Sequence, residues 1–368
     1  MTLSKLLLAG YFGCGNLGDD SILLGFLDGI RSLGHDVTLL SGAPDDTYRN
    51  YRVSSVPRRE MKDVQAEIAK CDALVFPGGS IFQDVTSVGS AMYYANLVKR
   101  AKVAGKKIIL LGQGIGPLNT LIGRTVSVQA FNTADVVAVR DPASLNALRK
   151  LGVKTRVELT ADPALLLAEP AASPDQVAFG VGSMRTIGLA PRPWGKNKET
   201  VQLFAEMARL LFKMNFMPMF IQMDLNLDGP LIAAIAAQVG GKVPDLMRLN
   251  HPVDIQQRMM RMDAVIAMRL HAGILATTVG VPAFMLSYDP KVSAFAKLMQ
   301  MHEAPMVESM NAQRLFDQFE RFLKDREANV RVLLHQRADL MPLARKNIEV
   351  LESVLSGQDA RGHKKVAQ

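Results

Sequence analysis

Short apolar runs alternate with amphipathic segments along the first half of the chain. Each run has the length of a β-strand that is buried on both faces. The runs cover Lys5–Gly10, Val37–Leu40, Ala73–Phe76, Lys107–Leu111, Val136–Val139 and Arg156–Leu159. Between them, apolar residues recur at helical spacing over Ser21–Leu33, Asp63–Lys70, Ala91–Ala104, Arg124–Thr133 and Pro142–Leu151. Strands that alternate with helices predict a parallel sheet covered by helices on both faces.

The pattern restarts after Glu169–Gln176, a segment with two prolines and little periodicity that we interpret as a linker. Strands are predicted at Val177–Gly182, Ile187–Ala190, Met217–Gln222, Ala264–Ala267 and Ala283–Leu286. Helices are predicted at Lys198–Lys213, Gly229–Val239, Ile255–Met262, Ala272–Val279 and Ser293–Met299, with a mainly helical C-terminus. We therefore expect one α/β domain over residues 1–169 and a similar one over 177–330, facing each other across a cleft. A helical segment and a basic tail would follow over 331–368.

Composition narrows the class of protein. The 368 residues are 48% hydrophobic and 21% charged, which excludes global disorder. The net charge of +8 suits a partner that is nucleic acid, an anionic membrane or an anionic small substrate. Nucleic acid fits least, because aromatic residues make up 6% and the basic residues are dispersed. No apolar run reaches the ~18 residues that span a bilayer. Two cysteines, Cys14 and Cys71, indicate a reducing, cytoplasmic compartment.

Gly-rich loops follow three predicted strands of the first half, at residues 13–20, 77–80 and 112–117. Ligands of parallel sheets bind at the carboxyl ends of the strands, and glycines there let the backbone approach an anion. Asp19 and Asp20 are expected to cap the helix that follows the first loop. The alternative for each loop is a simple tight turn. The residues expected to bind substrate from these loops are Gly15, Asn16, Asp19, Gly78, Gly79 and Gln113.

Further candidates for substrate binding follow other strands. Arg140 carries a guanidinium fork that suits a carboxylate or a phosphate, and the alternative is an ion pair within the domain. Asp162 follows the next strand, where an Asp turn before proline is the alternative. In the second half, Arg192 and Trp194 are candidates to contact a sugar or an anion. The alternative is that they form a plug at the surface. Lys291 would add an ammonium group, unless it is a solvated turn residue.

The Met268–Ala272 segment is the sharpest candidate site. Arg269 and His271 are two residues apart in a predicted extended turn, so they can face the same side. His271 would begin a helix, and a bound anion there would favour its protonated form. This makes His271 a candidate proton donor, with a structural histidine as the alternative. The histidines and cysteines show no metal-ligand spacing, so we expect no metal, and no G-x-S-x-G elbow is present.

These loops together resemble the polysaccharide pyruvyl transferase family, in particular its bacterial cell-wall type that pyruvylates the anchor polysaccharide of surface-layer proteins. The resemblance rests on GYFGCGNLGDD, FPGGSIFQD, GQGIGP, VAVRDPAS, TADPALLL, MRLHAGILATTVGVPAF and SYDPKV, in that order. It implies an α/β fold like that of GT-B glycosyltransferases, with two Rossmann-like domains whose parallel sheets face a cleft. The family's candidate catalytic residues fall on His271 and Arg269, and Arg140 and Lys291 match basic positions of its motifs.

The resemblance also implies an activity. The enzyme would transfer the pyruvyl group of phosphoenolpyruvate, without a cofactor, to a lipid-linked sugar, typically N-acetylmannosamine. The product would be a 4,6-ketal, with release of phosphate. Two other functions stay open: a GT-B glycosyltransferase that uses a nucleotide sugar, and a noncatalytic protein that binds glycans or nucleotides.

If the acceptor is lipid-linked, the basic residues on the surface could serve to bind a membrane. Outer cations would then hold the enzyme on the anionic inner face of the plasma membrane as a peripheral protein. An ordinary solvated surface is the alternative. The cations concerned are Lys99, Arg100, Lys102, Lys106, Lys107, the stretch Arg149–Arg156, Arg361, Lys364 and Lys365.

Overall fold

The computed structural model describes residues 3–85, 87–171, 185–240, 243, 249–306 and 310–357. The expected strand Val177–Gly182, most of the expected linker and the basic tail lie outside these residues. Contacts divide the chain into two compact units. Unit 1 comprises Met1–Cys14, Ile22–Leu166 and Met341–Gln368, and unit 2 comprises Gly15–Ser21 and Leu167–Leu340. The division differs from the expected boundaries at two places, because Gly15–Ser21 belongs to unit 2 and Met341–Gln368 to unit 1.

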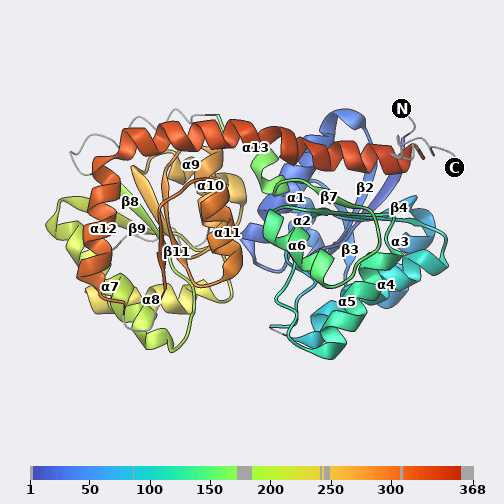
Figure 1. The fold of residues 1–368 in the computed structure, drawn as a ribbon, viewed down its shortest axis with the longest axis horizontal. Coiled ribbons are helices and arrows are strands. Elements are labelled where there is room, and N and C mark those ends of the chain that lie inside the picture. The colour runs from blue at the N-terminus through green and yellow to red at the C-terminus, as the bar shows by residue number, and fades with distance from the viewer. Residues whose placement is uncertain are drawn as a thin grey trace, which may run out of the picture. The chain divides into compact units, whose positions relative to one another are not determined.

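Unit 1 is built on a seven-stranded parallel sheet in the order β3-β2-β1-β4-β5-β6-β7 (Figure 1). The strands are β1 (Lys5–Leu8), β2 (Asp36–Ser41), β3 (Ser54–Pro57), β4 (Ala73–Phe76), β5 (Lys107–Gln113), β6 (Val136–Val139) and β7 (Val157–Leu159). The helices are α1 (Leu17–Ile30), α2 (Pro44–Tyr51), α3 (Met61–Lys70), α4 (Val88–Val103), α5 (Leu121–Thr133) and α6 (Pro142–Lys150), with 3-10 turns at Arg31–Leu33 and Pro163–Leu166.

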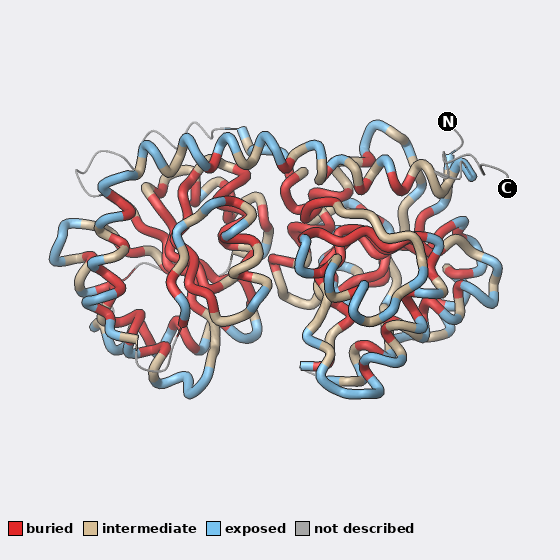
Figure 2. Tube along the Cα trace, viewed as in Figure 1, coloured by how far each residue is buried: buried red, intermediate tan, exposed pale blue. Residues whose placement is uncertain are grey.

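Both faces of this sheet are buried, which explains the continuous apolar runs. In β1, Leu7 packs into a core with residues of α3, α4 and α5. Its neighbours Leu6 and Leu8 point to the opposite face, where they meet α1 and the last turns of α13 (Arg326–Leu355). In Figure 2 the strands are buried along most of their length, whereas the helices alternate between buried and exposed positions.

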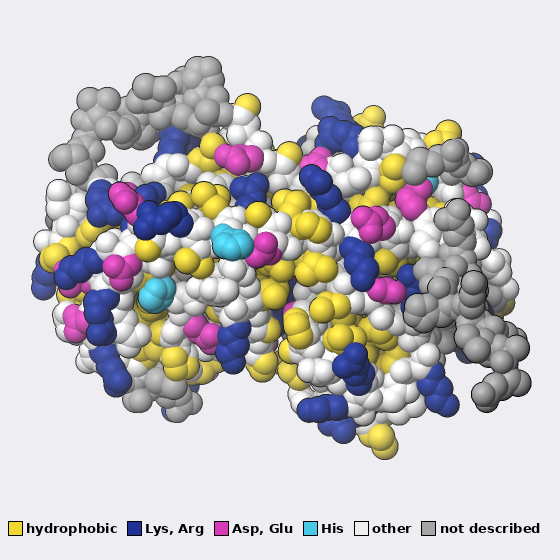
Figure 3. Space-filling view, turned by 45° about the horizontal axis from the view of Figure 1, so that its top comes forward, with side chains coloured by type: hydrophobic (Ala, Val, Ile, Leu, Met, Phe, Trp, Pro, Cys, Tyr) yellow, Lys and Arg dark blue, Asp and Glu magenta, His cyan; other side chains and the backbone are white. Residues whose placement is uncertain are grey.

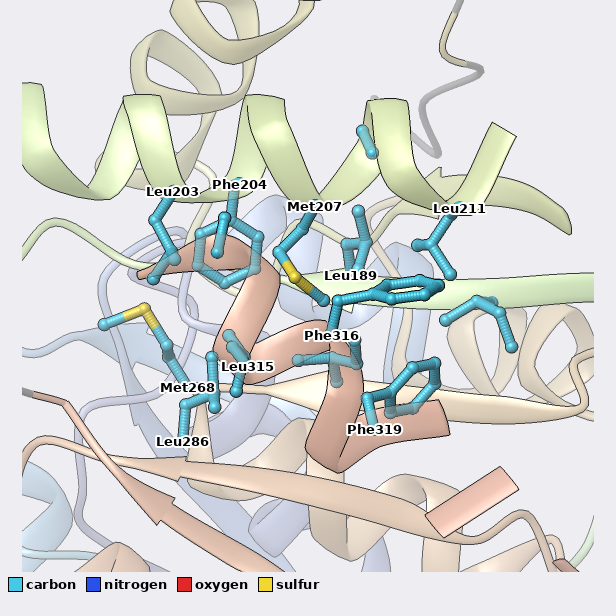
Figure 4. Close-up of a cluster of buried hydrophobic side chains, with 14 of the residues drawn as sticks. Leu189, Leu203, Phe204, Met207, Leu211, Met268, Leu286, Leu315, Phe316 and Phe319 are labelled. Atoms are coloured by element: carbon cyan, nitrogen blue, oxygen red, sulfur yellow. The ribbon is translucent and has the colours of Figure 1, made fainter. Parts of the chain in front are cut away.

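Unit 2 is built on a five-stranded parallel sheet in the order β12-β11-β10-β8-β9. Its strands are β8 (Arg185–Ala190), β9 (Phe216–Phe220), β10 (Ala264–Ala267), β11 (Ala283–Ser287) and β12 (Glu303–Pro305). Its helices are α7 (Asn197–Lys213), α8 (Asp228–Val239), α9 (Pro252–Met259), α10 (Leu270–Thr278), α11 (Pro290–Leu298), α12 (Ala312–Lys324) and the first part of α13. Figure 4 shows α7 and α12 closing one core, where Leu203, Phe204 and Met207 meet Leu315, Phe316 and Phe319.

The predicted strands Ala73–Phe76, Val136–Val139 and Ala264–Ala267 are confirmed to the residue. The prediction missed α2 and β3, because α2 buries only Thr47 and the edge strand β3 has no buried residue. The expected helix Ser21–Leu33 begins earlier, at Leu17. No helix in the described part of the chain is long and apolar enough to span a membrane.

Candidate functional site

Arg269 stands where β10 ends, and it is the N-cap residue of α10. Its Nε donates to Oδ2 of Asp228 at 3.1 Å, and its Nη2 donates to Oδ1 of the same carboxylate. Asp224 Oδ2 lies 3.8 Å from Nη2. Asp228 is the fully buried first residue of α8. One edge of the guanidinium therefore faces Asp228, and Nη1 is the nitrogen that Asp228 does not hold.

The Asp228 carboxylate also fixes the turn after β9. It accepts hydrogen bonds from the backbone N–H groups of Met223, at 3.1 Å, and Asp224, at 2.9 Å. Burial raises the pKa of this carboxyl group, and Arg269 and these backbone donors oppose that rise. Asp228 thus ties the turn after β9 to Arg269, two residues after the end of β10.

His271 is the second residue of α10, and its ring packs against the first turn of α1. A Cβ atom added at Gly18 would lie 2.6 Å from His271 Nδ1 and 2.9 Å from its Cγ. Such distances do not occur between unbonded atoms, so the imidazole can occupy this position only because residue 18 has no side chain. Gly18 is therefore a positioning residue for His271.

The first turn of α1 is held in place by the turn after β9. Leu17 N donates to Met223 O at 2.8 Å, and Leu225 N donates to Gly15 O at 2.7 Å. A second set of contacts joins the same two segments. Asp228, which holds the turn after β9, binds Arg269, and His271, two residues after Arg269, packs against Gly18 in the first turn of α1. All of these residues belong to unit 2, including the Gly15–Ser21 segment that precedes most of unit 1 in the sequence.

The expected capping by Asp19 and Asp20 is wrong. The Asn16 side chain caps α1 instead, because its Oδ1 accepts from Gly18 N at 3.0 Å. Asp19 and Asp20 lie inside the first turn of the helix, where their charge suits the helix dipole. Gly15 has a φ of +82°, and a Cβ atom there would lie 2.8 Å from Asn226 Nδ2. Substrate binding by Gly15, Asn16 and Asp19 stays a prediction.

Arg192 is a second arginine at the carboxyl end of the unit 2 sheet. Arg192 follows β8, and its Nη1 donates to the hydroxyl of Tyr288, which follows β11. The guanidinium carbon lies 4.3 Å from the centre of the Tyr288 ring. Because β10 lies between β8 and β11, this pair flanks the strand that leads into Arg269 and His271.

Lys291 lies in the first turn of α11, with its Nζ 3.6 Å from Asp289 Oδ2. Trp194 is half-buried and packs against the unit 2 core. Four predicted residues thus share one sheet edge: Arg192, Arg269, His271 and Lys291.

In unit 1, Arg140 is buried at the end of β6 and forms an ion pair with an acid of the same unit. Its Nη1 donates to Asp162 Oδ2 at 2.7 Å, and its Nη2 donates to Ser80 Oγ at 3.0 Å. Both charged side chains are at most 5% exposed. A Cβ atom at Gly114 would lie 2.6 Å from Arg140 Nη2. Arg140 and Asp162 therefore form an ion pair within the unit. Substrate binding by Arg140 and Asp162 stays a prediction.

Gln113, Gly78 and Gly79 also have structural partners. The fully buried Gln113 donates from its side-chain amide to Leu111 O at 2.8 Å. Gly79 O accepts from Gly114 N at 3.0 Å, and a Cβ atom at Gly78 would lie 2.8 Å from Ile22. The hydrogen bond between Gly79 and Gly114 joins the ends of β4 and β5. Substrate binding by the three residues stays a prediction.

Three residues at these strand ends were not among the predicted site residues: Gly18, Asp228 and Arg58, the residue that follows β3. Gly18 stands in the first Gly-rich loop, but its contact with His271, far away in the sequence, is not visible there. Asp228 follows Asp224 by one helical turn after a predicted strand, which was the available signal. Arg58 follows β3, the strand that was missed, so nothing marked it as a residue at a strand end.

The chain is similar to a known protein family over most of its length. The sequence model of the polysaccharide pyruvyl transferase family matches residues 16–290. The amylovoran biosynthesis protein AmsJ of Erwinia amylovora is 21% identical over 364 residues, covering 81% of this chain and 87% of that protein.

Solved structures of similar fold include nucleotide complexes. The S. aureus MnaA–UDP structure has a TM-score of 0.68 at 11% identity, covering 96% of this chain and 97% of that one. Anabaena HepE in complex with UDP-glucose has a TM-score of 0.65 at 14% identity, covering 96% and 100%. These likenesses confirm the expected GT-B-like class, with two Rossmann-like parallel sheets.

Proposed function

Because the chain belongs to the polysaccharide pyruvyl transferase family, we propose that it transfers the pyruvyl group of phosphoenolpyruvate to a sugar of a cell-wall polysaccharide precursor. Membership makes the chain a transferase of polysaccharide biosynthesis, and the likeness to AmsJ agrees with this. The proposed acceptor is a lipid-linked N-acetylmannosamine whose polysaccharide anchors surface-layer proteins. The proposed products are a 4,6-ketal and phosphate.

The reaction needs a proton donor and a site for two anionic groups. Protonation of the methylene carbon of phosphoenolpyruvate leaves an oxocarbenium-like centre on the adjacent carbon. One sugar hydroxyl attacks this carbon, phosphate leaves, and the second hydroxyl closes the ketal. Of the two hydroxyl protons that are lost, one balances the proton given to carbon and the other leaves with phosphate.

The placement of His271 carries this proposal. Its ring is held between the first turn of α1 and the start of α10, in the same network as Arg269. We assign the proton donation to His271. Nη1 of Arg269 and the ammonium group of Lys291 would bind an anionic end of the donor. Arg192 would bind the other, because no carboxylate pairs with it among the described residues.

Phosphate release tests the reaction. The protein is incubated with phosphoenolpyruvate and a lipid-mimetic N-acetylmannosamine acceptor, and phosphate should appear only when both are present. His271→Ala should lower kcat by about 100- to 10,000-fold, the usual contribution of a general acid. The matched control is His335→Ala, since His335 is exposed on α13. A wild-type rate for His271→Ala would exclude His271 as the donor.

A nucleotide-sugar glycosyltransferase is the second candidate function. The observation that favours it is the likeness of fold to proteins whose structures hold UDP or UDP-glucose. The same incubation with a UDP-sugar distinguishes the two, because this activity would release UDP rather than phosphate. UDP release without any turnover of phosphoenolpyruvate would replace the first proposal.

We further propose that the enzyme works at an anionic membrane surface through α4 and α5 of unit 1. These helices pack against each other, and residues 85–134 contain no Asp or Glu. At the start of α5, Leu121 is 80% exposed and Ile122 is 59% exposed, and the exposed Arg124 lies in the same turn of the helix. The exposed cations Lys99 and Lys102 lie in the second half of α4. Exposed apolar side chains beside basic ones are typical of proteins that bind a lipid surface.

The other basic residues that were expected to contact the membrane give less support to a membrane-binding surface. The amino groups of Lys106 and Lys107 are bound to the carbonyl groups of Ala69 and Leu355. On the face in Figure 3, the Lys and Arg side chains are scattered, with acidic ones between them.

Sedimentation with phosphatidylglycerol vesicles tests the membrane proposal, with phosphatidylcholine vesicles for comparison. Leu121→Glu should reduce binding to the anionic vesicles, and Met214→Glu, at a 49% exposed position of unit 2, should not. Equal binding by both variants would exclude this surface.

A further inference from the structure

Arg58 is an arginine without a carboxylate partner at the carboxyl end of the unit 1 sheet. It follows β3, and its backbone is fixed on both sides: its N–H donates to Ser41 O at 2.9 Å, and its carbonyl accepts from the Tyr93 hydroxyl at 2.6 Å. Its Nη1 donates to Cys14 Sγ at 3.3 Å, and its Nη2 donates to the Tyr94 hydroxyl at 3.0 Å. Its Nε is buried without a hydrogen-bond partner in the described part of the chain.

Arg58 differs from the paired arginines of the two sheets because no carboxylate balances its charge among the described residues. Arg140 and Arg269 each face a buried aspartate. Among the described residues, Arg58 forms no ion pair with Asp or Glu, and its side chain is bound by a thiol and a phenol. A half-buried guanidinium stays charged, and leaving it without an anion is costly. A bound oxyanion would supply the missing counter-charge.

Aromatic rings surround this cation. The guanidinium carbon lies 4.8 Å from the centre of the Tyr93 ring, 5.4 Å from that of Tyr11 and 5.6 Å from that of Tyr94. Tyr94 is buried, but Tyr11 is 43% exposed. An exposed ring beside a cation offers an apolar face on which the C–H groups of a pyranose can pack. The pair therefore suits a ligand with both a sugar ring and a phosphate.

We propose that Arg58 and Tyr11 form a subsite for a phosphorylated sugar, in which Arg58 binds the phosphate and Tyr11 packs against the ring. The subsite lies at the carboxyl ends of β1 and β3, where parallel sheets bind ligands. It rests on the proposed function, since it would hold the sugar-phosphate end of the acceptor. Cys14 lies beside it, and a Cβ atom at Gly42 would lie 2.6 Å from the Cys14 sulfur. Gly42 thus leaves the space that the thiol occupies.

Protection of Cys14 from iodoacetamide tests the subsite without any turnover. The second thiol, Cys71, is buried, so the alkylation rate reports on Cys14. N-acetylmannosamine 1-phosphate should slow alkylation in a saturable manner, and phosphoenolpyruvate and inorganic phosphate are the comparison ligands. Because no reaction is needed, this result is independent of whether phosphoenolpyruvate proves to be the donor.

Two variants and a matched control complete the test. Arg58→Gln should raise the half-protecting concentration about 10- to 100-fold, the loss expected for a hydrogen bond to a charged group. Arg59→Gln removes the same charge from the exposed neighbouring residue and should leave protection unchanged. Tyr11→Ala, at an exposed ring, should weaken protection by the sugar phosphate but not by inorganic phosphate.

The proposal fails on any of three results. These are the absence of protection by the sugar phosphate, wild-type protection in Arg58→Gln, and protection by phosphoenolpyruvate at lower concentrations than by the sugar phosphate. The last result would assign Arg58 to the donor.

Discussion

Substitution of Gly18 by alanine tests whether His271 is held in a productive position by the first turn of α1. A Cβ atom at residue 18 would lie 2.6 Å from His271 Nδ1, 2.9 Å from Cγ and 3.0 Å from Cβ. Ordinary contacts of a Cβ atom begin at 3.4 Å, so the nearest ring atom must retreat by about 0.8 Å. A displacement of about 1 Å at a reacting group can cost about 100-fold in rate.

The expected result is therefore a fall of about 100-fold in kcat for phosphate release, equivalent to about 2.7 kcal/mol of activation free energy. Alanine is a better helix former than glycine by up to ~1 kcal/mol, and residue 18 is the second residue of α1. The loss of activity should thus exceed any loss of thermal stability. Measurement of kcat, KM and Tm on the same preparation separates the two effects.

Gly89→Ala is the matched control. Gly89 is the second residue of α4, and among the described residues an added Cβ atom would meet only the Ser87 hydroxyl, at 3.1 Å. This variant should keep wild-type kcat. If Gly18→Ala also turns over at the wild-type rate, either His271 is not the proton donor or its position does not depend on Gly18.

Three other predictions concern ionisable groups. Asp228→Ala leaves the Arg269 guanidinium without its buried partner, so chemical denaturation should show a loss of about 3–5 kcal/mol, and a loss below ~1 kcal/mol would contradict the pairing. Iodoacetamide at pH 8 should modify Cys14 but not Cys71, because burial raises the pKa of the Cys71 thiol to about 11; mass mapping of the peptides checks this. Burial alone would raise the pKa of Asp84, but hydrogen bonds from Thr120 and Asn119 outweigh it and lower this pKa below its ordinary value of 3.8. The ionised carboxylate therefore stabilises the fold above pH 3.8. This stabilisation disappears as the pH falls through the pKa of Asp84 in the folded protein. The Tm difference between wild type and Asp84→Asn should accordingly be present at pH 6 and vanish at the acid end of a pH series.

The hydrophobic pattern determined most of the two sheets. The strands β4, β6 and β10 are apolar at every position because helices cover both faces, and such runs are visible in the sequence without any knowledge of partners. The elements α2 and β3 escaped prediction for the opposite reason. They lie at the edge of the sheet and bury little, so no apolar stripe marks them.

The order of strands and loops also located the candidate site. Arg269, His271, Arg192 and Lys291 each follow a strand or begin the next helix, and strand ends of a parallel sheet share one edge. The sequence alone therefore places these residues at one edge of the unit 2 sheet.

The partners of the charged groups were decided by tertiary structure alone. Arg140 pairs with Asp162, 22 residues away, and Arg269 pairs with Asp228, 41 residues away. His271 is placed by Gly18, a residue near the start of the sequence, and Arg58 has no carboxylate partner among the described residues. Burial and pairing depend on which strand ends become neighbours, and that order arises from long-range packing. The sequence by itself thus determined the sheets and the edge that carries the chemistry, whereas tertiary structure decided which cations have counter-charges and which can receive an anion.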